Sequence, residues 1–198
     1  MRGRPPVPPA ARPLAVALTG GIGAGKSEAL RAFARHGAAV ISSDEVVHRL
    51  YREDDELRAA LRERWGDRVF RDGDVDRAAI ARIVFADRAE LAWLESELHP
   101  RVRAAIDDWL GRQTADVAVA EIPLLYETGG ERRFDRVVVV TAPPEVRRAR
   151  RASAPEREER LVPEEEKVRR ADFAYVNDGP LERLDAFVAD VLEALRRS

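Results

Sequence analysis

The sequence has no cysteine, almost no lysine, asparagine or glutamine, and no long apolar stretch. Without cysteine the chain can form no disulfide, no zinc–thiolate site and no cysteine nucleophile. No apolar run approaches the roughly 20 residues of a membrane-spanning helix, so we expect no membrane partner. The apolar run at residues 14–18 is also too short for a signal peptide. We therefore expect a cytoplasmic protein in which residues 1–13, rich in Arg and Pro, form a disordered tail.

The charges nearly cancel, because 34 Lys and Arg residues stand against 36 Asp and Glu residues, which gives a net charge of -2. Proteins dedicated to nucleic acid usually carry a basic surplus, so this balance argues against such a partner. The apolar fraction of 45% argues against disorder. A chain of 198 residues is long enough for one domain with a sizeable core. We expect a monomer or a weak homo-oligomer.

Short apolar runs alternate with helical patterns, which is typical of an α/β fold with a parallel sheet and helices on both faces. We expect strands at residues 14–19, 38–41, 117–122 and 137–141, with a weaker candidate at 173–176. Helices are expected at residues 27–36, with Gly37 as the stop, and at 181–195.

Residues 44–113 contain no clear strand pattern and predict a helical insert between the second and third strands. The expected helices cover residues 44–51, 55–65, 76–85 and 89–110, and the last is broken at Pro100. Residues 152–166 are polar and lack apolar periodicity, so we expect a mobile, charged loop there. The chain is thus divided into a tail at 1–13 and a single domain at 14–198.

Residues 20–27 read Gly-Gly-Ile-Gly-Ala-Gly-Lys-Ser and fit the phosphate-binding pattern G-x-x-x-x-G-K-[ST]. Glycines allow a tight loop whose N–H groups can approach phosphate oxygens, and the following helix directs its N-terminus at the anion. Lys26 would reach the terminal phosphates and Ser27 would bind Mg²⁺. A chance match is the alternative, but the motif lies between an apolar strand and an amphipathic helix. Lys26 is also one of only two lysines in an Arg-rich chain.

Two carboxylates lie at the edge of the sheet where ligands of parallel sheets bind: Asp44 follows the second predicted strand, and Glu121 ends the third. Asp44 could accept a proton from an attacking hydroxyl, or either it or Ser43 could simply cap the next helix. Glu121 could lie near magnesium, or it could merely begin a loop. His48 lies four residues after Asp44 and could contact substrate or be a plain surface histidine.

Arginines cluster after the fourth predicted strand, at Arg147, Arg148, Arg150 and Arg151 on a short helix, and at Arg157 and Arg160 beyond it. Kinases of the P-loop class use arginines to neutralise the transferring phosphoryl group. The alternative is that this chain carries arginine everywhere, so that only one or two of the six are functional. The phosphate loop does not reveal the acceptor, but the absence of an Asn-Lys-x-Asp motif disfavours a GTPase.

Together these motifs resemble the dephospho-CoA kinase family, and the resemblance covers nearly the whole chain after Pro13. The matching segments are 18–27, 40–44 with His48, 75–77, 83–85, His99-Pro100, 121–127, Phe134-Asp135, Glu166-Lys167, Ala171-Asp172 and 177–179. Each segment is weak alone, whereas their order and combination are specific. Thr-Gly-Gly-Ile-Gly at 19–23 and Ile-Pro-Leu-Leu at 122–125 are the most telling.

The resemblance implies a P-loop kinase fold with a five-stranded parallel core, a helical substrate-binding insert at 44–113 and a short lid at 147–166. It implies transfer of the γ-phosphoryl group of ATP to the 3′-hydroxyl of the ribose of dephospho-coenzyme A, with ATP and Mg²⁺. The implied catalytic residues are Asp44 as the base, Lys26 and Arg150. The implied ATP-binding residues are Gly21, Ile22, Gly23, Ala24, Gly25, Lys26, Ser27, Glu28, Arg147, Arg157 and Asn177, with Ser27 also the metal ligand. The implied acceptor-binding residues are Asp44, His48, His99 and Leu124.

The sequence departs from the usual family pattern at several places. Ser42-Ser43-Asp44 stands for Asp-Ala-Asp, Glu28 replaces a common Thr, Leu161 replaces a frequent Gln, and the lid is several residues short, with Ala154 where a late arginine is expected. Two alternatives therefore stay open: a kinase for another nucleotide-like acceptor, and an ATP-binding switch protein with a degenerate lid.

Overall fold

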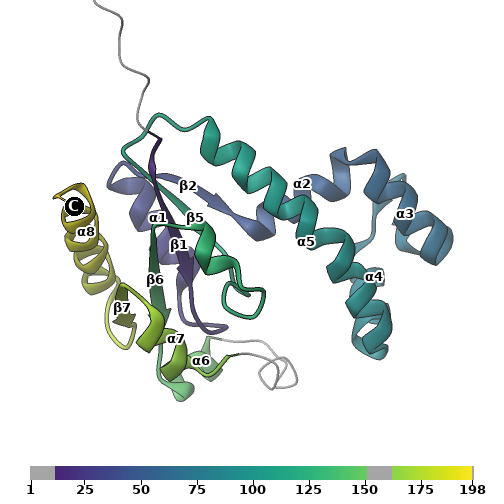
Figure 1. The fold of residues 1–198 in the computed structure, drawn as a ribbon. Coiled ribbons are helices and arrows are strands. Elements are labelled where there is room, and N and C mark those ends of the chain that lie inside the picture. Colours follow the sequence, from purple (N-terminus) through teal and green to yellow (C-terminus); the bar gives the residue numbers. More distant parts are fainter. Residues whose placement is uncertain (1–11, 151–161, 198) are drawn as a thin grey trace, which may run out of the picture. The chain divides into compact units, whose positions relative to one another are not determined.

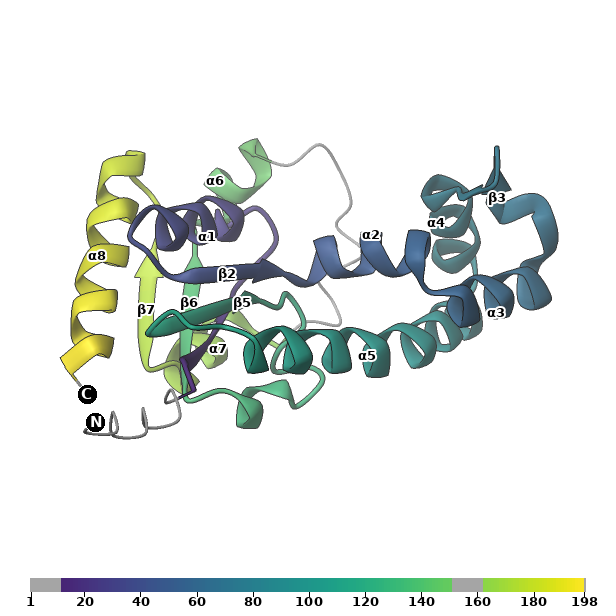
Figure 2. The ribbon, with the colours of Figure 1, turned by 90° about the horizontal axis from the view of Figure 1, so that it is seen from above.

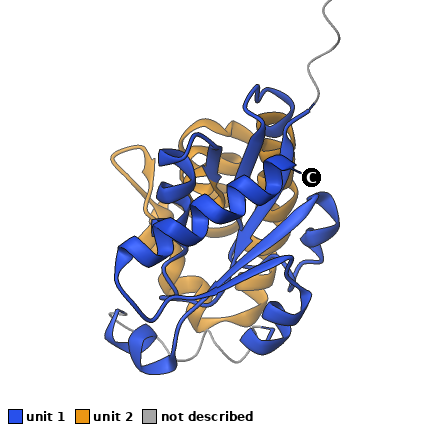
Figure 3. Cartoon of the chain, turned by 90° about the vertical axis from the view of Figure 1, so that its left-hand side faces the viewer, with its two compact units in different colours: residues 1–41, 110–198 blue, residues 42–109 orange. Residues whose placement is uncertain are grey.

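The structure is a computed structural model and describes residues 12–150 and 162–197 (Figure 1). Predictions for residues 1–11, and for Arg151, Arg157 and Arg160, concern positions outside the described residues. The chain divides into two compact units, which Figure 3 colours separately. One comprises residues 1–41 and 110–198, and the other comprises residues 42–109.

A five-stranded sheet forms the centre of the first unit, in the order β2-β5-β1-β6-β7 (Figure 1). The strands are β1 (Leu14–Thr19), β2 (Ala39–Ser42), β5 (Val117–Glu121), β6 (Arg136–Thr141) and β7 (Phe173–Val176). β1 pairs in parallel with β5 and β6, and β6 pairs in parallel with β7. The predicted α/β fold with a five-stranded parallel sheet is therefore confirmed.

The two faces of the sheet are covered by different helices, because successive side chains of each strand point to opposite sides. Val16 and Leu18 pack against α1 (Lys26–Arg35) and α8 (Leu181–Arg197) in one apolar cluster. Ala17 packs on the other face with the segment after β5 and with Val168 of α7 (Glu164–Arg170). Figure 2 shows α1 and α8 separated from α7 by the strands.

Two short helices complete the first unit at the ends of strands. The 3₁₀ helix η2 (Gly130–Arg133) precedes β6, and the helix α6 (Pro144–Ala149) follows β6. The first described residue, Arg12, donates hydrogen bonds of 2.9 and 2.8 Å to the two carboxylate oxygens of Asp135. Asp135 also accepts the backbone N–H of Ala15 at 2.8 Å, so the start of β1 is fixed to the segment before β6.

The second unit is mainly helical and has its own apolar core around Leu57, Leu61 and Trp65. Its helices and strands are α2 (Ser43–Glu53), α3 (Asp55–Trp65), η1 (Gly66–Val69), β3 (Phe70–Arg71), β4 (Asp74–Val75), α4 (Arg77–Ala86) and α5 (Arg88–Gly111), the last of which runs on into the first unit.

Two expectations for this unit are wrong. β3 and β4 form a small antiparallel hairpin where no strand was expected. Strands of two residues are too short to reveal themselves by alternation, although the Asp72-Gly73 turn between them is a known hairpin signal. The helix α5 also continues through Pro100 instead of breaking there. Pro100 is exposed, so water can bond the carbonyl group that loses its helical partner.

A third expectation is wrong at its C-terminal end, because residues 164–166 belong to α7 rather than to a loop. Pro163 precedes the helix, three glutamates occupy its first turn, and basic residues occupy its last turn. This arrangement suits the helix dipole at both ends and is typical of a helix start and stop. None of the helices in residues 12–150 and 162–197 has the length and hydrophobicity that spanning a bilayer requires.

Candidate active site

The predicted phosphate loop connects β1 to α1 at the carboxyl edge of the parallel strands. Gly25 is the N-cap of α1 and has a left-handed backbone with φ of 99°, a conformation that glycine adopts readily. A side chain at Gly25 would also collide with the amide nitrogen of Asn177. The helix then begins at Lys26, so Lys26 and Ser27 belong to its first turn, where N–H groups lack helical partners.

Lys26 is folded back over its own loop. Its Nζ donates to the carbonyl oxygens of Gly21 at 2.9 Å and Gly20 at 3.2 Å, and the residue is 9% exposed. The ammonium group is therefore held within the loop. The Ser27 side chain is exposed beside it, whereas Ile22 is half-buried and Ala24 is buried.

Asn177, which follows β7, packs against the phosphate loop from the other end of the sequence. Its Nδ2 donates to the carbonyl of Ala24 at 2.9 Å, and its backbone N–H donates to Thr141 at 2.7 Å. The residue is only 2% exposed. Its Oδ1 is buried without a hydrogen-bond partner among the described residues, which leaves one acceptor available beside the loop.

The arginines after β6 have different surroundings. Nε of Arg147 donates to the carbonyl of Ala142 at 3.1 Å, and its Nη1 lies 3.3 Å from a carboxylate oxygen of Glu164. Arg148 is exposed. Arg150 is also exposed, but its Nη1 would lie only 3.7 Å from a Cβ atom at Gly25. The guanidinium of Arg150 thus lies beside the phosphate loop.

Sequence reasoning missed two residues here, Thr141 and Glu164. The Thr141 hydroxyl donates to Oε2 of Glu164, and the Glu164 carboxylate lies against Gly21 of the loop. No sequence signal marks this contact between β6 and α7. The helix-start pattern at Pro163 could at least have placed Glu164 in the first turn of a helix.

The other predicted residues of the first unit lie close in sequence to the loop or to β5. Glu28 forms ion pairs with Arg31 and, at 3.4 Å, with Arg35 of the same helix. Leu124 is half-buried in the turn after β5, where its carbonyl accepts the Thr128 hydroxyl at 2.8 Å. Glu121 ends β5 and is 6% exposed.

The remaining predicted residues belong to the second unit. Asp44 is exposed in the first turn of α2, and His48 is half-buried one turn later. The N-cap of α2 is Ser42, which makes no side-chain capping hydrogen bond, so neither Ser43 nor Asp44 is the cap. His99 is half-buried within α5.

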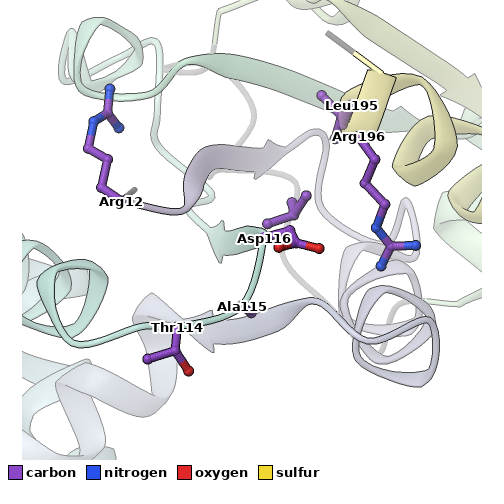
Figure 4. A pocket seen from close by; sticks show the side chains of 7 residues that line it. Arg12, Thr114, Ala115, Asp116, Leu195 and Arg196 are labelled. Carbon is purple, nitrogen blue, oxygen red and sulfur yellow. The ribbon is translucent and has the colours of Figure 1, made fainter. Parts of the chain in front are cut away.

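A hollow of about 460 Å³ lies in the first unit away from the phosphate loop (Figure 4). Arg12, Thr114, Asp116 and Arg196 contribute polar groups to its walls. It lies where β1 and β5 begin, the opposite ends of those strands from the loop. None of the predicted site residues lines it.

The dephospho-CoA kinase family model matches residues 14–183, which include the sheet, the phosphate loop and the helical unit. The chain belongs to the dephospho-CoA kinase family. A dephospho-CoA kinase of Mesorhizobium japonicum is 45% identical over 194 residues, covering 92% of this chain and 97% of that protein. A dephospho-CoA kinase of Rhodopseudomonas palustris is 38% identical over 195 residues, covering 93% of this chain and 96% of that protein.

Solved structures share the fold of this chain. TT1252 from Thermus thermophilus is 36% identical, with a TM-score of 0.76 over 93% of this chain and 99% of that chain. The dephospho-CoA kinase from Campylobacter jejuni is 22% identical and has a TM-score of 0.63 over 93% and 98%. The shikimate kinase from Aquifex aeolicus is 16% identical, with a TM-score of 0.52 over 93% and 99%. The last two likenesses concern the fold alone, which is that of the P-loop kinases.

Proposed function

We propose that this kinase transfers the γ-phosphoryl group of ATP to the 3′-hydroxyl of the ribose of dephospho-coenzyme A, the final step of coenzyme A biosynthesis. The observation that carries the proposal is the phosphate loop at the carboxyl edge of the sheet, with Lys26 buried in it and Asn177 packed against it. The family match across residues 14–183 supplies the acceptor.

The loop residues 21–28 bind the ATP phosphates. The amides of the first turn of α1 face the anion, and the Lys26 ammonium moves from the carbonyls of Gly20 and Gly21 to the terminal phosphates. The exposed Ser27 in the first turn of α1 would hold Mg²⁺ through its hydroxyl oxygen, together with oxygens of the nucleotide phosphates, which are the kind of donor that Mg²⁺ prefers. Bound there, it would neutralise charge that develops on the β- and γ-phosphates.

Asp44 acts as the general base. Its carboxylate is exposed and is not committed to capping α2, so it can accept the proton of the ribose 3′-hydroxyl. The hydroxyl oxygen then forms a bond to the γ-phosphorus as the bond to the β-phosphate oxygen breaks, and ADP leaves. His48, His99 and Leu124 are assigned to the acceptor, while Arg147 and Asn177 are assigned to the nucleotide.

Arg150 stabilises the transferring phosphoryl group. It is exposed, and its guanidinium lies beside Gly25 of the loop, close to where the phosphates bind. We assign residues 44–113 to acceptor binding and residues 147–166 to the lid. We also propose a cytoplasmic monomer or weak homo-oligomer that requires neither membrane nor nucleic acid.

Acceptor-dependent release of ADP tests the function. Purified protein with ATP and Mg²⁺ is supplied with dephospho-CoA, with other nucleotide-like alcohols such as adenosine, or with no acceptor. We expect strong stimulation by dephospho-CoA and formation of coenzyme A, and no stimulation in the Lys26→Ala variant. Stimulation by another acceptor alone would favour a different small-molecule kinase. ATP binding without turnover on any acceptor would favour a switch protein.

A further inference from the structure

A closed ring of polar contacts joins the end of β6 to α6 and α7. The Thr141 hydroxyl donates to Oε2 of Glu164, while Oε1 of Glu164 lies 3.3 Å from Nη1 of Arg147. The ring closes because Nε of Arg147 donates to the carbonyl of Ala142, the residue after Thr141. The side chain of Arg147 is only 16% exposed and that of Glu164 only 24%.

This ring touches the phosphate loop at two points. A Cβ atom at Gly21 would collide with the Glu164 carboxylate and lie 3.4 Å from Nη1 of Arg147. A Cβ atom at Gly23 would lie 3.1 Å from the backbone oxygen of Arg147. The Glu164–Arg147 pair therefore packs against the segment that positions the phosphate-binding amides.

We infer that Glu164 is a positioning residue for nucleotide binding, which acts by holding Arg147 against the phosphate loop. The inference rests on the proposed binding of ATP at this loop. Arg147 carries a long side chain, and fixing it at both Nε and Nη1 removes rotational freedom before the ligand arrives. A planar guanidinium with several donors suits this bridging position better than a lysine would.

The neighbouring acids of α7 serve as internal comparisons. Glu165 is exposed, and Oε1 of Glu166 lies 3.4 Å from Nη1 of Arg170 in the same helix. Glu164 is the acid of that first turn which contacts both Thr141 and the loop. If α7 contributed only nonspecific charge, neutralising Glu164 or Glu165 should change nucleotide affinity equally. If Glu164 positions Arg147, only the change at Glu164 should weaken nucleotide binding.

The test measures the dissociation constants of ATP and ADP by calorimetry, without acceptor, for Glu164→Gln and its matched control Glu165→Gln. Loss of the charge that holds Arg147 should weaken nucleotide binding about tenfold in Glu164→Gln, since the partly buried ion pair at 3.3 Å is lost. Glu165→Gln should bind like the wild type. At saturating ATP, kcat of Glu164→Gln should stay within about twofold of wild type, because binding rather than chemistry is affected. Unchanged or tighter binding in Glu164→Gln overturns the inference.

A double-variant cycle tests whether Glu164 acts through Arg147. In an Arg147→Ala background, the Glu164→Gln change should have no further effect on ATP affinity. Full additivity would show that Glu164 acts without Arg147 and would contradict the inference.

If Glu164→Gln fails to fold, the variants Thr141→Val and Thr141→Ser test the same inference. Loss of the hydroxyl in the valine variant should weaken ATP binding, and the serine variant should restore it. Equal affinities in these two variants would overturn the inference. The affinity measurements omit the acceptor, and only the kcat comparison needs it. Failure of dephospho-CoA as a substrate would therefore contradict the proposed function while the affinities still test the role of Glu164.

Discussion

Lys167 and Glu127 form an ion pair that is almost completely buried, with Nζ 2.7 Å from Oε1 and the lysine side chain 1% exposed. The same oxygen of Glu127 accepts the backbone N–H of Val162 at 3.0 Å. The pair therefore fixes α7 to the segment that follows β5. It also explains the second lysine of an Arg-rich chain, because a compact ammonium fits a closed site that a guanidinium would overfill.

Replacing Lys167 with Met should destabilise the protein by about 3–5 kcal/mol, because Glu127 would keep a buried charge without its partner. The double variant Lys167→Met/Glu127→Gln should recover much of that loss, since the glutamine oxygen can still accept the Val162 amide. Urea unfolding monitored by circular dichroism measures both. Arg170→Met is the matched control, because Arg170 of the same helix pairs with Glu131 at a more exposed site. Equal losses of stability in Lys167→Met and Arg170→Met would show that burial of the ion pair does not matter.

Lys26→Ala should abolish phosphoryl transfer, because the charge at the terminal phosphates is lost. Lys26→Arg should fail nearly as badly: Lys26 is 9% exposed and bonds two loop carbonyls, so the site has no room for a guanidinium. Steady-state kinetics and ATP binding are the measurements. Full activity in the arginine variant would show that only charge matters at this position.

Asp44→Asn should lower kcat by roughly a hundredfold or more while ATP affinity stays near normal, as expected for a lost general base. The change should leave stability nearly untouched, because the N-cap of α2 is Ser42. Glu45→Gln is the matched control, since Glu45 is the neighbouring exposed acid of the same helical turn. Near-normal turnover of Asp44→Asn would exclude Asp44 as the base.

Arg150→Ala should reduce kcat by about a hundred- to a thousandfold, the usual cost of removing a donor that stabilises transition-state charge. Arg147→Ala should instead raise the dissociation constant of ATP, because Arg147 is engaged beside Gly21 and Gly23. Arg148→Ala is the control and should have little effect, since Arg148 is exposed on the same helix. Similar small losses in all three variants would mean that the arginines supply only diffuse positive potential.

The Arg12–Asp135 contact should make stability depend on pH in the acid range. Hydrogen bonds from Arg12, together with that from the Ala15 amide, hold the pKa of the Asp135 carboxyl below its usual range. The ionised Asp135 carboxylate therefore adds to the free energy of unfolding above the unfolded-state pKa of about 3.9. This contribution is lost as the pH falls through the lower pKa of the folded state. Arg12→Ala should thus be less stable than wild type at neutral pH, and the difference should shrink in acid.

Urea unfolding at a series of pH values measures this effect, with Asp135→Asn as the second variant. In the Asp135→Asn background, Arg12→Ala should cost the same stability at every pH, because the titrating group is gone. A gap between wild type and Arg12→Ala that stays constant into strong acid would show that Asp135 is not responsible.

Features that depend on neighbouring residues could be predicted from the amino-acid sequence. The apolar strand, the glycine loop and the amphipathic helix of residues 14–36 are each specified within a few positions. The sheet class follows from alternating strands and helices for the same reason. Two features could not be predicted in this way. They are the two-residue strands of the β3–β4 hairpin and the continuation of α5 through Pro100. The strands are too short to show alternation, and at the exposed Pro100 water can bond the carbonyl group that loses its helical partner.

The side chains that surround the phosphate loop are brought there by long-range packing. Asn177 bonds to Ala24 across 153 positions of sequence, and Glu164 meets Thr141 across 23. Nothing in the spacing of these residues marks such contacts, because each depends on the strand order β1-β6-β7 and on α7 packing over β6. The motif thus fixes where phosphate binds, whereas the surrounding shell of polar contacts exists only once the strands have paired.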